Sequence, residues 1–170
     1  MTHTWKPEVP DLVEYEDFGS FYAREVRSVV GLAYVLSGSR TGAEDLAQDA
    51  FVAAYRHWQR VRAYENAGAW VRRVVVNRSI SHGRRTVAEA KARLRLHAQR
   101  VVVPELSAEN EDMWAAVRRL PRRQSQVIAL HYWDDLTVHD IALVLGLSDA
   151  SVKTHLQRAR QTVAEQLPKD

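Results

Sequence analysis

The chain has 170 residues, which allows one domain or two small ones, and its 46% hydrophobic residues are enough to bury a core. Its formal net charge of +3 is only mildly basic, so any nucleic-acid surface must come from local clustering of cations. The absence of cysteine excludes disulfides, thiolate chemistry and cysteine-ligated zinc. We expect a cytoplasmic protein without membrane insertion, because the N-terminus lacks the apolar core of a secretion signal and no apolar run approaches membrane-spanning length.

The N-terminal part predicts two helices after a short arm. Residues 1–14 show no hydrophobic periodicity, and we expect them to be a flexible arm. Helical periodicity then begins near Tyr15 and predicts a first helix that ends at Gly38. A second helix is expected to begin with a capping box formed by Thr41 and Glu44. Its polar face includes Asp45, Gln48 and Asp49.

A basic stripe marks the next segment. We expect a polar loop over Arg60–Gly68 and a third helix over Ala69–Arg85, although its three consecutive valines favour a strand. No acidic residue occurs between Glu65 and Glu89. Unbalanced positive charge repels itself in a free protein, so a polyanionic partner explains the stripe better than a solvated face does. The polar face of the third helix carries Arg72, Arg73, Asn77, Arg78, His82, Arg84 and Arg85.

An acidic segment divides the chain. Residues 101–111 are opposite in charge to their neighbours, and we interpret them as a linker between two small domains, 15–100 and 112–170. Two short helices should follow, one ended by Pro121 and one over Arg122–Trp133. The predicted fold class is therefore all-α, with two small helical domains joined by an acidic linker.

The segment Thr137–Arg160 has the pattern of a helix-turn-helix, which would make the C-terminal domain a DNA-binding one. Its apolar residues fall on two helical faces, separated by a turn at Gly146. Glycine tolerates positive φ where the first helix ends, and Thr137 and Ser148 are expected to cap the two helices. The outward side chains of the second helix are donors or acceptors without a carboxylate: Ser151, Lys153, Thr154, His155, Gln157 and Arg158.

The order and spacing of several motifs resemble the bacterial sigma factors of the extracytoplasmic-function (ECF) class, within the sigma-70 superfamily. The motifs are Ala43–Phe51 (AEDLAQDAF), Ala69–Asn77 (AWVRRVVVN), Leu120-Pro121, Asp140-Ile141-Ala142 and Val152-Lys153. The resemblance implies a non-enzymatic subunit that binds core RNA polymerase and directs promoter recognition, DNA opening and transcription initiation. We expect no cofactor and no metal. An anti-sigma factor is a further partner expected from the resemblance.

The resemblance also implies roles for the two domains and for single residues. In the family, the second helix docks on the largest polymerase subunit, which corresponds here to Asp45, Gln48 and Asp49. The third helix and the loop before it bind and open the −10 element, for which the candidates are Arg62, Tyr64, Asn66, Trp70, Arg73 and Asn77. The helix-turn-helix of the region 4-like domain reads the −35 element, for which the candidates are Ser151, Lys153, Thr154, His155 and Arg158.

Other classes of function explain the sequence less completely. A helix-turn-helix regulator with a helical sensing domain accounts for Thr137–Arg160 but leaves the basic third helix and the acidic linker unexplained. An adaptor that binds only protein gives the basic surfaces no role. A metal or catalytic site lacks any supporting motif. The nearest group of suitable side chains is His131, Asp134, Asp135, His139 and Asp140.

Overall fold

The computed structural model describes residues 15–85, 103 and 105–167, without the side chains of 80–85 and 108–109. Within these ranges the chain forms helices and no strand, which confirms the all-α prediction. The expected arm 1–14 and residues 86–102 of the expected N-terminal domain and linker lie outside them. The helices are α1 Phe18–Ser37, α2 Arg40–Arg56, α3 Trp58–Val61, α4 Ala67–Arg85, α6 Ala108–Arg119, α7 Arg122–Tyr132, α8 Val138–Leu145 and α9 Asp149–Gln166.

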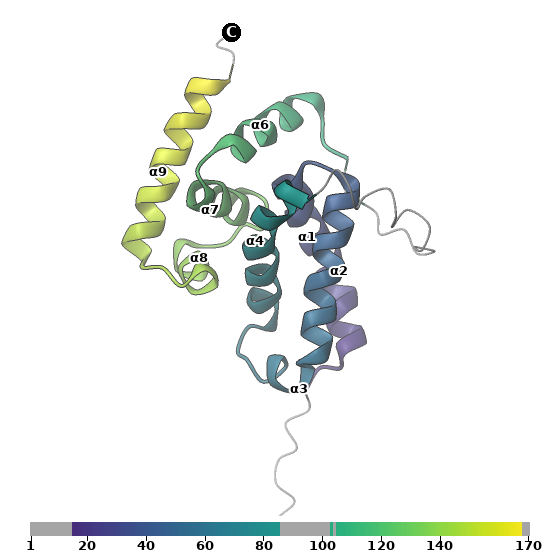
Figure 1. The fold of residues 1–170 in the computed structure, drawn as a ribbon. Coiled ribbons are helices and arrows are strands. Elements are labelled where there is room, and N and C mark those ends of the chain that lie inside the picture. The colour runs from purple at the N-terminus through teal and green to yellow at the C-terminus, as the bar shows by residue number, and fades with distance from the viewer. Residues whose placement is uncertain (1–14, 86–102, 104, 168–170) are drawn as a thin grey trace, which may run out of the picture.

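The helices form two groups that lie against each other (Figure 1). In the first group, α1, α2 and α4 pack around side chains that are fully or almost fully buried, including Phe21, Leu32, Leu46 and Val75. In the second, α7, α8 and α9 enclose Leu130, Ile141 and Val152. Removal of this apolar surface from water, at about 25 cal/mol per Å², is the main stabilising contribution. The two groups share one apolar core, because α4 contacts α8 and α1 contacts both α6 and α7.

The N-terminal cap of α2 differs from the prediction. Ser39, in extended conformation, is the cap residue, and its Oγ accepts a hydrogen bond from the amide of Gly42 at 3.0 Å. The proposed capping box of Thr41 and Glu44 is therefore wrong, because the helix already begins at Arg40. As a result Glu44 lies beyond the first turn, where it interacts less with the positive end of the helix dipole.

The basic third helix, α4, is a helix as predicted, and it begins two residues earlier, at Ala67. The Asn66 side chain accepts from the amide of Ala69 at 2.8 Å and satisfies one of the free amides of the first turn. The valines that favoured a strand serve the core instead, since Val75 and Val76 are fully buried. The expected loop before this helix contains the end of a single helical turn, α3.

The acidic segment is partly helical. Helix α6 begins at Ala108, so residues 108–111 of the expected linker belong to its first turn. Ser107 caps it, with its side chain accepting from the amide of Asn110 at 3.3 Å. Helix α7 follows after Pro121 and ends at Tyr132, one residue before the predicted end.

The helix-turn-helix is formed by α8 and α9, as the sequence predicts. Gly146 has a φ of 64° at the end of α8, in the left-handed region that favours glycine. Thr137 and Ser148 cap the two helices by accepting from the amides of Asp140 at 3.1 Å and Ser151 at 3.2 Å. The Asp140 carboxylate accepts from the Thr137 hydroxyl at 2.6 Å, instead of from the backbone amide that a complete capping box would use.

The two possible caps of α2 can be separated by mutation. Ser39→Ala should lower the free energy of unfolding by about 1 kcal/mol, because it removes the acceptor of the Gly42 amide. The control Thr41→Ala should change it by less than about 0.5 kcal/mol, since Thr41 is exposed within the first turn. Urea denaturation followed by circular dichroism measures both, and a larger effect at Thr41 would contradict the assignment.

Candidate polymerase and promoter surfaces

The outer face of α2 carries the residues predicted to bind polymerase. Gln48 and Asp49 are exposed and Asp45 is half-buried. Asp49 Oδ2 lies 3.2 Å from Arg78 Nη1 of α4, an exposed pair that contributes little to stability. Val52 and Tyr55, which are 40% and 66% exposed, follow on the same stretch of helix. Exposed apolar side chains beside carboxylate and amide groups suit a protein-binding surface.

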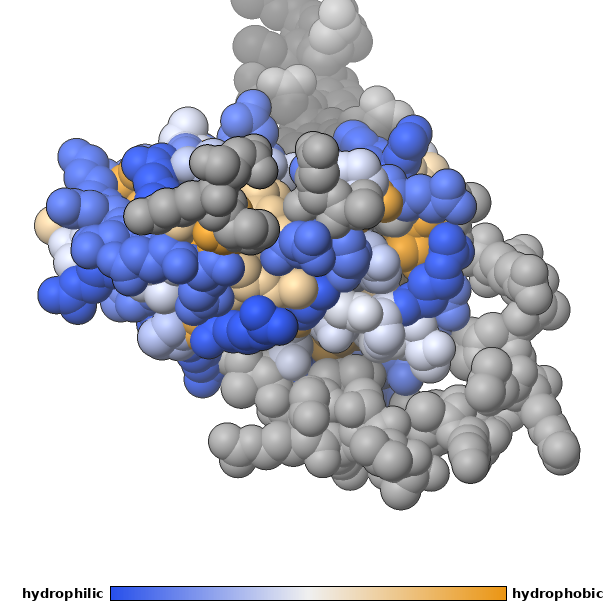
Figure 2. All heavy atoms as spheres, turned by 90° about the horizontal axis from the view of Figure 1, so that it is seen from above, coloured by the Kyte–Doolittle hydropathy of each residue, from blue (hydrophilic) through white to orange (hydrophobic). Residues whose placement is uncertain are grey.

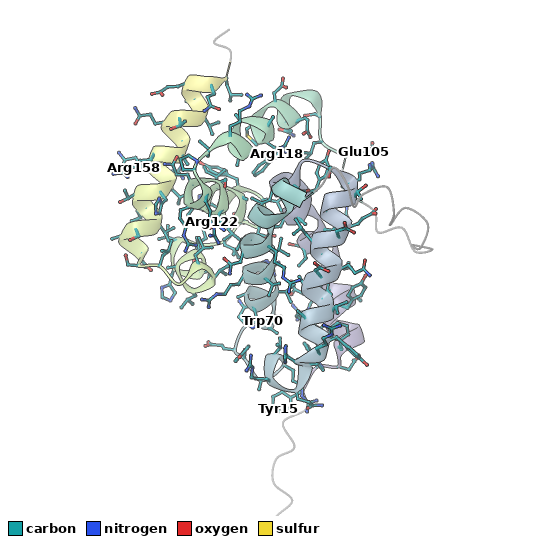
Figure 3. The ribbon with its side chains drawn as sticks, in the orientation of Figure 1. Tyr15, Trp70, Glu105, Arg118, Arg122 and Arg158 are labelled. Atoms are coloured by element: carbon teal, nitrogen blue, oxygen red, sulfur yellow. The ribbon has the colours of Figure 1, made fainter. Side chains whose placement is uncertain are left out.

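The −10 candidates in the loop and the first turn of α4 are accessible to different degrees. The Arg62 guanidinium lies over the Tyr15 ring, 5.0 Å from its centroid. Tyr64 is 42% exposed, whereas Trp70 is half-buried at the end of α4 that adjoins the loop (Figure 3). The Asn66 side chain already caps α4, so the same oxygen would have to serve both the helix and a base.

The remaining two −10 candidates, Arg73 and Asn77, lie where α4 meets the C-terminal domain. Asn77 Oδ1 accepts a hydrogen bond at 3.4 Å from Arg122, which extends from α7 towards α4 (Figure 3). Arg73 Nη2 is 3.5 Å from the position that a Cβ atom at Gly146 would occupy. Both are exposed, but a DNA strand that follows α4 towards them would meet α7 and α8.

Arg72 does not belong to the basic stripe, and this corrects the sequence interpretation. Its side chain is only 13% exposed and points into a group that we call the Arg72 cluster, formed with Glu25, Ser28 and Asp134. Arg72 donates from Nε to Asp134 at 2.9 Å, from Nη1 to Glu25 at 2.7 Å and from Nη2 to Ser28 Oγ at 3.0 Å. The Ser28 hydroxyl in turn donates to Asp134. Gly68 leaves room for this cluster, since a Cβ there would lie 2.8 Å from Arg72 Nη1.

Burial sets the protonation energetics of the cluster. Burial by itself would lower the pKa of Arg72, but the carboxylates of Asp134 and Glu25 outweigh it and raise that pKa. Burial raises the pKa of Asp134, and the attraction of Arg72 and the Ser28 hydrogen bond offset only part of the effect. The two shifts are compatible, because Arg72 faces two carboxylates whereas Asp134 faces one cation and a second carboxylate. The Arg72 guanidinium therefore stays protonated, whereas keeping Asp134 ionised in this buried position costs free energy.

One signal in the sequence points to the cluster in retrospect. Glu25 stands four residues from both Phe21 and Val29, so it is an acid within the buried stripe of α1. Asp134 gives no such signal, since it lies between two helices among polar residues and meets its partner 62 positions away.

The outward face of α9 carries the −35 candidates. Lys153, Thr154 and Arg158 are exposed, and Arg158 points away from the body of the molecule (Figure 3). Ser151 is half-buried and its hydroxyl accepts from Ser148 Oγ at 2.9 Å. His155 is half-buried and its Nδ1 is enclosed without a hydrogen bond, so only Nε2 can reach DNA without movement of the ring. From above, the described surface is mostly hydrophilic, with small apolar areas between the polar ones (Figure 2).

The group of histidines and acids near α8 is dispersed. Asp134 bonds to Arg72, Asp140 bonds to Thr137, and His139 Nδ1 lies 3.5 Å from Asp149. Over the described ranges, no group of three or more such side chains could hold a metal ion. No helix in the described part of the chain is long and apolar enough to cross a membrane.

Comparisons with known proteins match both domains. The family Sigma-70 region 2 matches residues 21–88, and Sigma-70, region 4 matches residues 110–163. The RNA polymerase sigma-E factor of Streptomyces antibioticus is 29% identical over 126 residues, covering 74% of this chain and 70% of that protein. The ECF RNA polymerase sigma factor SigW of Bacillus subtilis is 28% identical over 152 residues, covering 80% and 81%.

The fold also matches solved structures. The sigma factor RpoE of Bartonella quintana, in complex with the anti-sigma factor NepR, has a TM-score of 0.69 and 23% identity, covering 88% of this chain and 96% of that one. CnrH, in complex with the cytosolic domain of CnrY, has a TM-score of 0.62 and 22% identity, covering 87% and 85%. At these identities the structures support the fold.

Two sigma-70 regions in the family's order, on an all-helical fold, define a class of transcription initiation factor. The chain belongs to the sigma-70 family and, with its relatives, to the ECF class. It is a sigma factor that binds core RNA polymerase and directs promoter recognition. Sigma factors are non-enzymatic, so the acidic and histidine side chains need no catalytic role.

The raised pKa of Asp134 predicts a specific pH dependence. The folded state favours the protonated carboxyl, so this group's contribution to stability is present below the ordinary aspartate pKa and is lost as the pH rises through the raised value. The variant Asp134→Asn has no titrating group at this position. The difference in unfolding free energy, wild type minus Asp134→Asn, should therefore decrease as the pH rises from about 4 to about 7. Urea unfolding at the two pH values measures it, and a difference that increases with pH would contradict the assignment.

Proposed function

We propose that the N-terminal domain, residues 15–100, binds core polymerase through α2 and the −10 element through α4 and its preceding loop. The C-terminal domain, residues 112–170, reads the −35 element through α9. The observation that carries the proposal is the capped helix-turn-helix, whose second helix exposes Lys153, Thr154 and Arg158. Such a helix fits the major groove, where side-chain donors contact phosphates and base edges.

The α2 surface suits the docking of a basic partner. Gln48 and Asp49 are exposed there, with Asp45 half-buried one turn earlier. Carboxylate and amide oxygens accept charge-assisted hydrogen bonds from arginine, and this supports the proposed contact with the largest polymerase subunit. The adjacent Val52 and Tyr55 add apolar surface that would be buried by the same partner.

DNA opening at the −10 element requires no hydrolysis by this chain. Stacking of an extruded base on an aromatic side chain contributes about 1–3 kcal/mol, which is comparable to the cost of unstacking that base. Tyr64 is the exposed aromatic of the loop, and Trp70 lies half-buried one turn into α4. Arg62, Asn66, Arg73 and Asn77 would hold the backbone and edges of the opened strand.

An anti-sigma factor and a cytoplasmic location complete the proposal. Both solved structures of similar fold contain a partner protein, and one of these partners is named an anti-sigma factor. We extend such a partner to this chain, because a sigma factor that is always active would compete continuously for core polymerase. The cytoplasm is where core polymerase and promoter DNA are found.

The polymerase contact can be tested with a double variant. Gln48→Ala with Asp49→Ala should weaken binding to purified core RNA polymerase by about tenfold or more, because charge-assisted contacts are lost. Both side chains are exposed, so the helical content and melting temperature should stay close to those of the wild type. Binding is measured by fluorescence anisotropy, and unchanged affinity would remove α2 from the proposed contact.

The promoter contact is tested with Arg158→Ala. Loss of one DNA contact should reduce initiation at a −35-dependent promoter by about 5- to 150-fold, equivalent to about 1–3 kcal/mol, while binding to core polymerase is retained. Reconstituted transcription with purified core measures the first effect and anisotropy measures the second. If Arg158→Ala abolished core binding, the assignment of the two domains would be wrong. If the wild-type chain failed to bind core polymerase, the sigma function itself would be wrong.

A further inference from the structure

The segment that precedes α1 lies against the loop that leads into α4, and the two meet at Tyr15. The Tyr15 ring is 46% exposed, and the Arg62 guanidinium lies over it with Cζ 5.0 Å from the ring centroid. We propose that Tyr15 and Arg62 form a stacking platform for one unpaired base of the opened −10 strand, in which Tyr15 positions the guanidinium. The proposal rests on the proposed function, because it adds a base-binding site to the −10 surface.

The chain next to Tyr15 is held in place by two neighbouring residues. Glu16 accepts two hydrogen bonds from Arg24, at 3.2 Å from Nε and 2.7 Å from Nη2. Asp17 caps α1 by accepting from the Ser20 amide at 3.1 Å and from the Ser20 hydroxyl at 2.6 Å. These hydrogen bonds lower the pKa of Asp17, so the carboxylate of the cap is ionised at neutral pH. The position of Tyr15 is therefore defined by the start of α1.

The loop that carries Arg62 is anchored in the core by the single helical turn α3. Val61 is fully buried, and the centroid of the Trp58 ring lies 4.9 Å from that of Phe21. After α3, the amide of Tyr64 donates to Val61 O at 3.1 Å and closes a turn around Arg62. The contact between the two side chains of the platform therefore rests on fixed supports in α1 and α3.

A guanidinium that lies on an aromatic ring is well suited to receive a base on its other planar face. Unstacked bases in single-stranded nucleic acids are recognised by stacking on aromatic rings or on arginine guanidinium planes. Arg62 is half-buried and not enclosed. The Tyr15 ring restricts the orientation of its guanidinium plane, so less conformational entropy is lost when a base stacks on it.

The charges around the platform indicate which part of a nucleotide faces each side. Residues 56–62 include three arginines and no acidic residue, so the loop side attracts the phosphate backbone. On the other side, Glu16 and Asp17 directly follow Tyr15, and their carboxylates would repel a phosphate. The uncharged base is therefore the part of the nucleotide that suits the platform, whereas the phosphates suit the arginines of the loop.

The platform lies at the same end of the molecule as the two aromatic −10 candidates. Tyr15 lies beside α3, at the end of the N-terminal bundle where α4 begins, and Trp70 lies one turn into α4 (Figure 3). Tyr64, which is 42% exposed, follows Arg62 by two residues. In Figure 1 this end points away from α6 and α7. A single strand that contacts Tyr64 therefore passes next to the platform.

The platform can be tested with the holoenzyme on fork DNA that carries a duplex −35 element and a single-stranded −10 strand. Each nucleotide of the single strand is replaced in turn by an abasic site, and the affinity is measured by fluorescence anisotropy. At one position, the abasic site should weaken binding of the wild type by about fivefold or more, because a stacked base is lost. In Tyr15→Ala this penalty should disappear at that position alone, since the base no longer has a platform.

Three further variants separate stacking from other roles. Tyr15→Phe keeps the ring and should keep the abasic penalty. Arg62→Lys keeps the positive charge but lacks the guanidinium plane, so it should lose the penalty at the same position. The matched control Tyr132→Ala removes another exposed tyrosine that lies under an arginine, with Arg160 Cζ 5.6 Å from the ring centroid, in the C-terminal domain. This control should leave every penalty unchanged.

The possible results are clearly separated. Unchanged penalties at every position in Tyr15→Ala would overturn the platform, and so would loss of the penalty in Tyr15→Phe or in the Tyr132→Ala control. If Tyr15→Ala weakened binding to core polymerase without DNA, Tyr15 would belong to the polymerase surface and the proposal would be wrong. A failure of the proposed function is distinguishable, because the wild-type holoenzyme would then show no abasic penalty anywhere in the −10 strand.

Discussion

The arrangement of the molecule depends on a single buried guanidinium. Arg72 projects from α4 towards the other domain, and its guanidinium pairs with Glu25 through Nη1 and with Asp134 through Nε. A charged group in such surroundings requires paired charges and nearly complete hydrogen bonding, so the positions of α1, α4 and the segment between α7 and α8 are coupled to one another. The ring of Trp133, which follows the end of α7, lies directly on Gly31 in the middle of α1, and this apolar contact reinforces that geometry.

Helix α4 serves two purposes, because neighbouring residues on an α-helix point in directions about 100° apart. Arg72 faces inward and holds the other domain, whereas Arg73 and Asn77 lie at the exposed edge and are proposed to hold DNA. The packing of the domains therefore depends on one face of α4 and the proposed DNA contacts on another. The proposed polymerase surface on α2, with Gln48 and Asp49 exposed, is separate from both of these faces.

Local signals in the sequence predicted most of the fold. The turn at Gly146 and the caps Thr137 and Ser148 depend on neighbouring residues and were confirmed. The cap of α2 was misassigned because Ser39 and Thr41 both have suitable hydroxyl groups, and only the observed start of the helix decides between them. The interdomain contacts could not be predicted, because a pair such as Arg72 and Asp134 is 62 residues apart and is brought together by packing alone. Helical periodicity predicted which positions are exposed, but it did not predict that Arg72, within a run of basic residues, points into the protein.

The central claim is that two separate surfaces of this chain divide the work, with α2 docking on core polymerase and α9 reading the −35 element. Site-specific photocrosslinking in the promoter-bound holoenzyme, with the crosslinker placed in turn at the exposed positions of Asp49 and Arg158, tests it directly. The crosslinker at position 49 should attach to the largest polymerase subunit, and the crosslinker at position 158 should attach to the −35 element. Attachment of position 158 to polymerase, or of position 49 to DNA, would contradict this account.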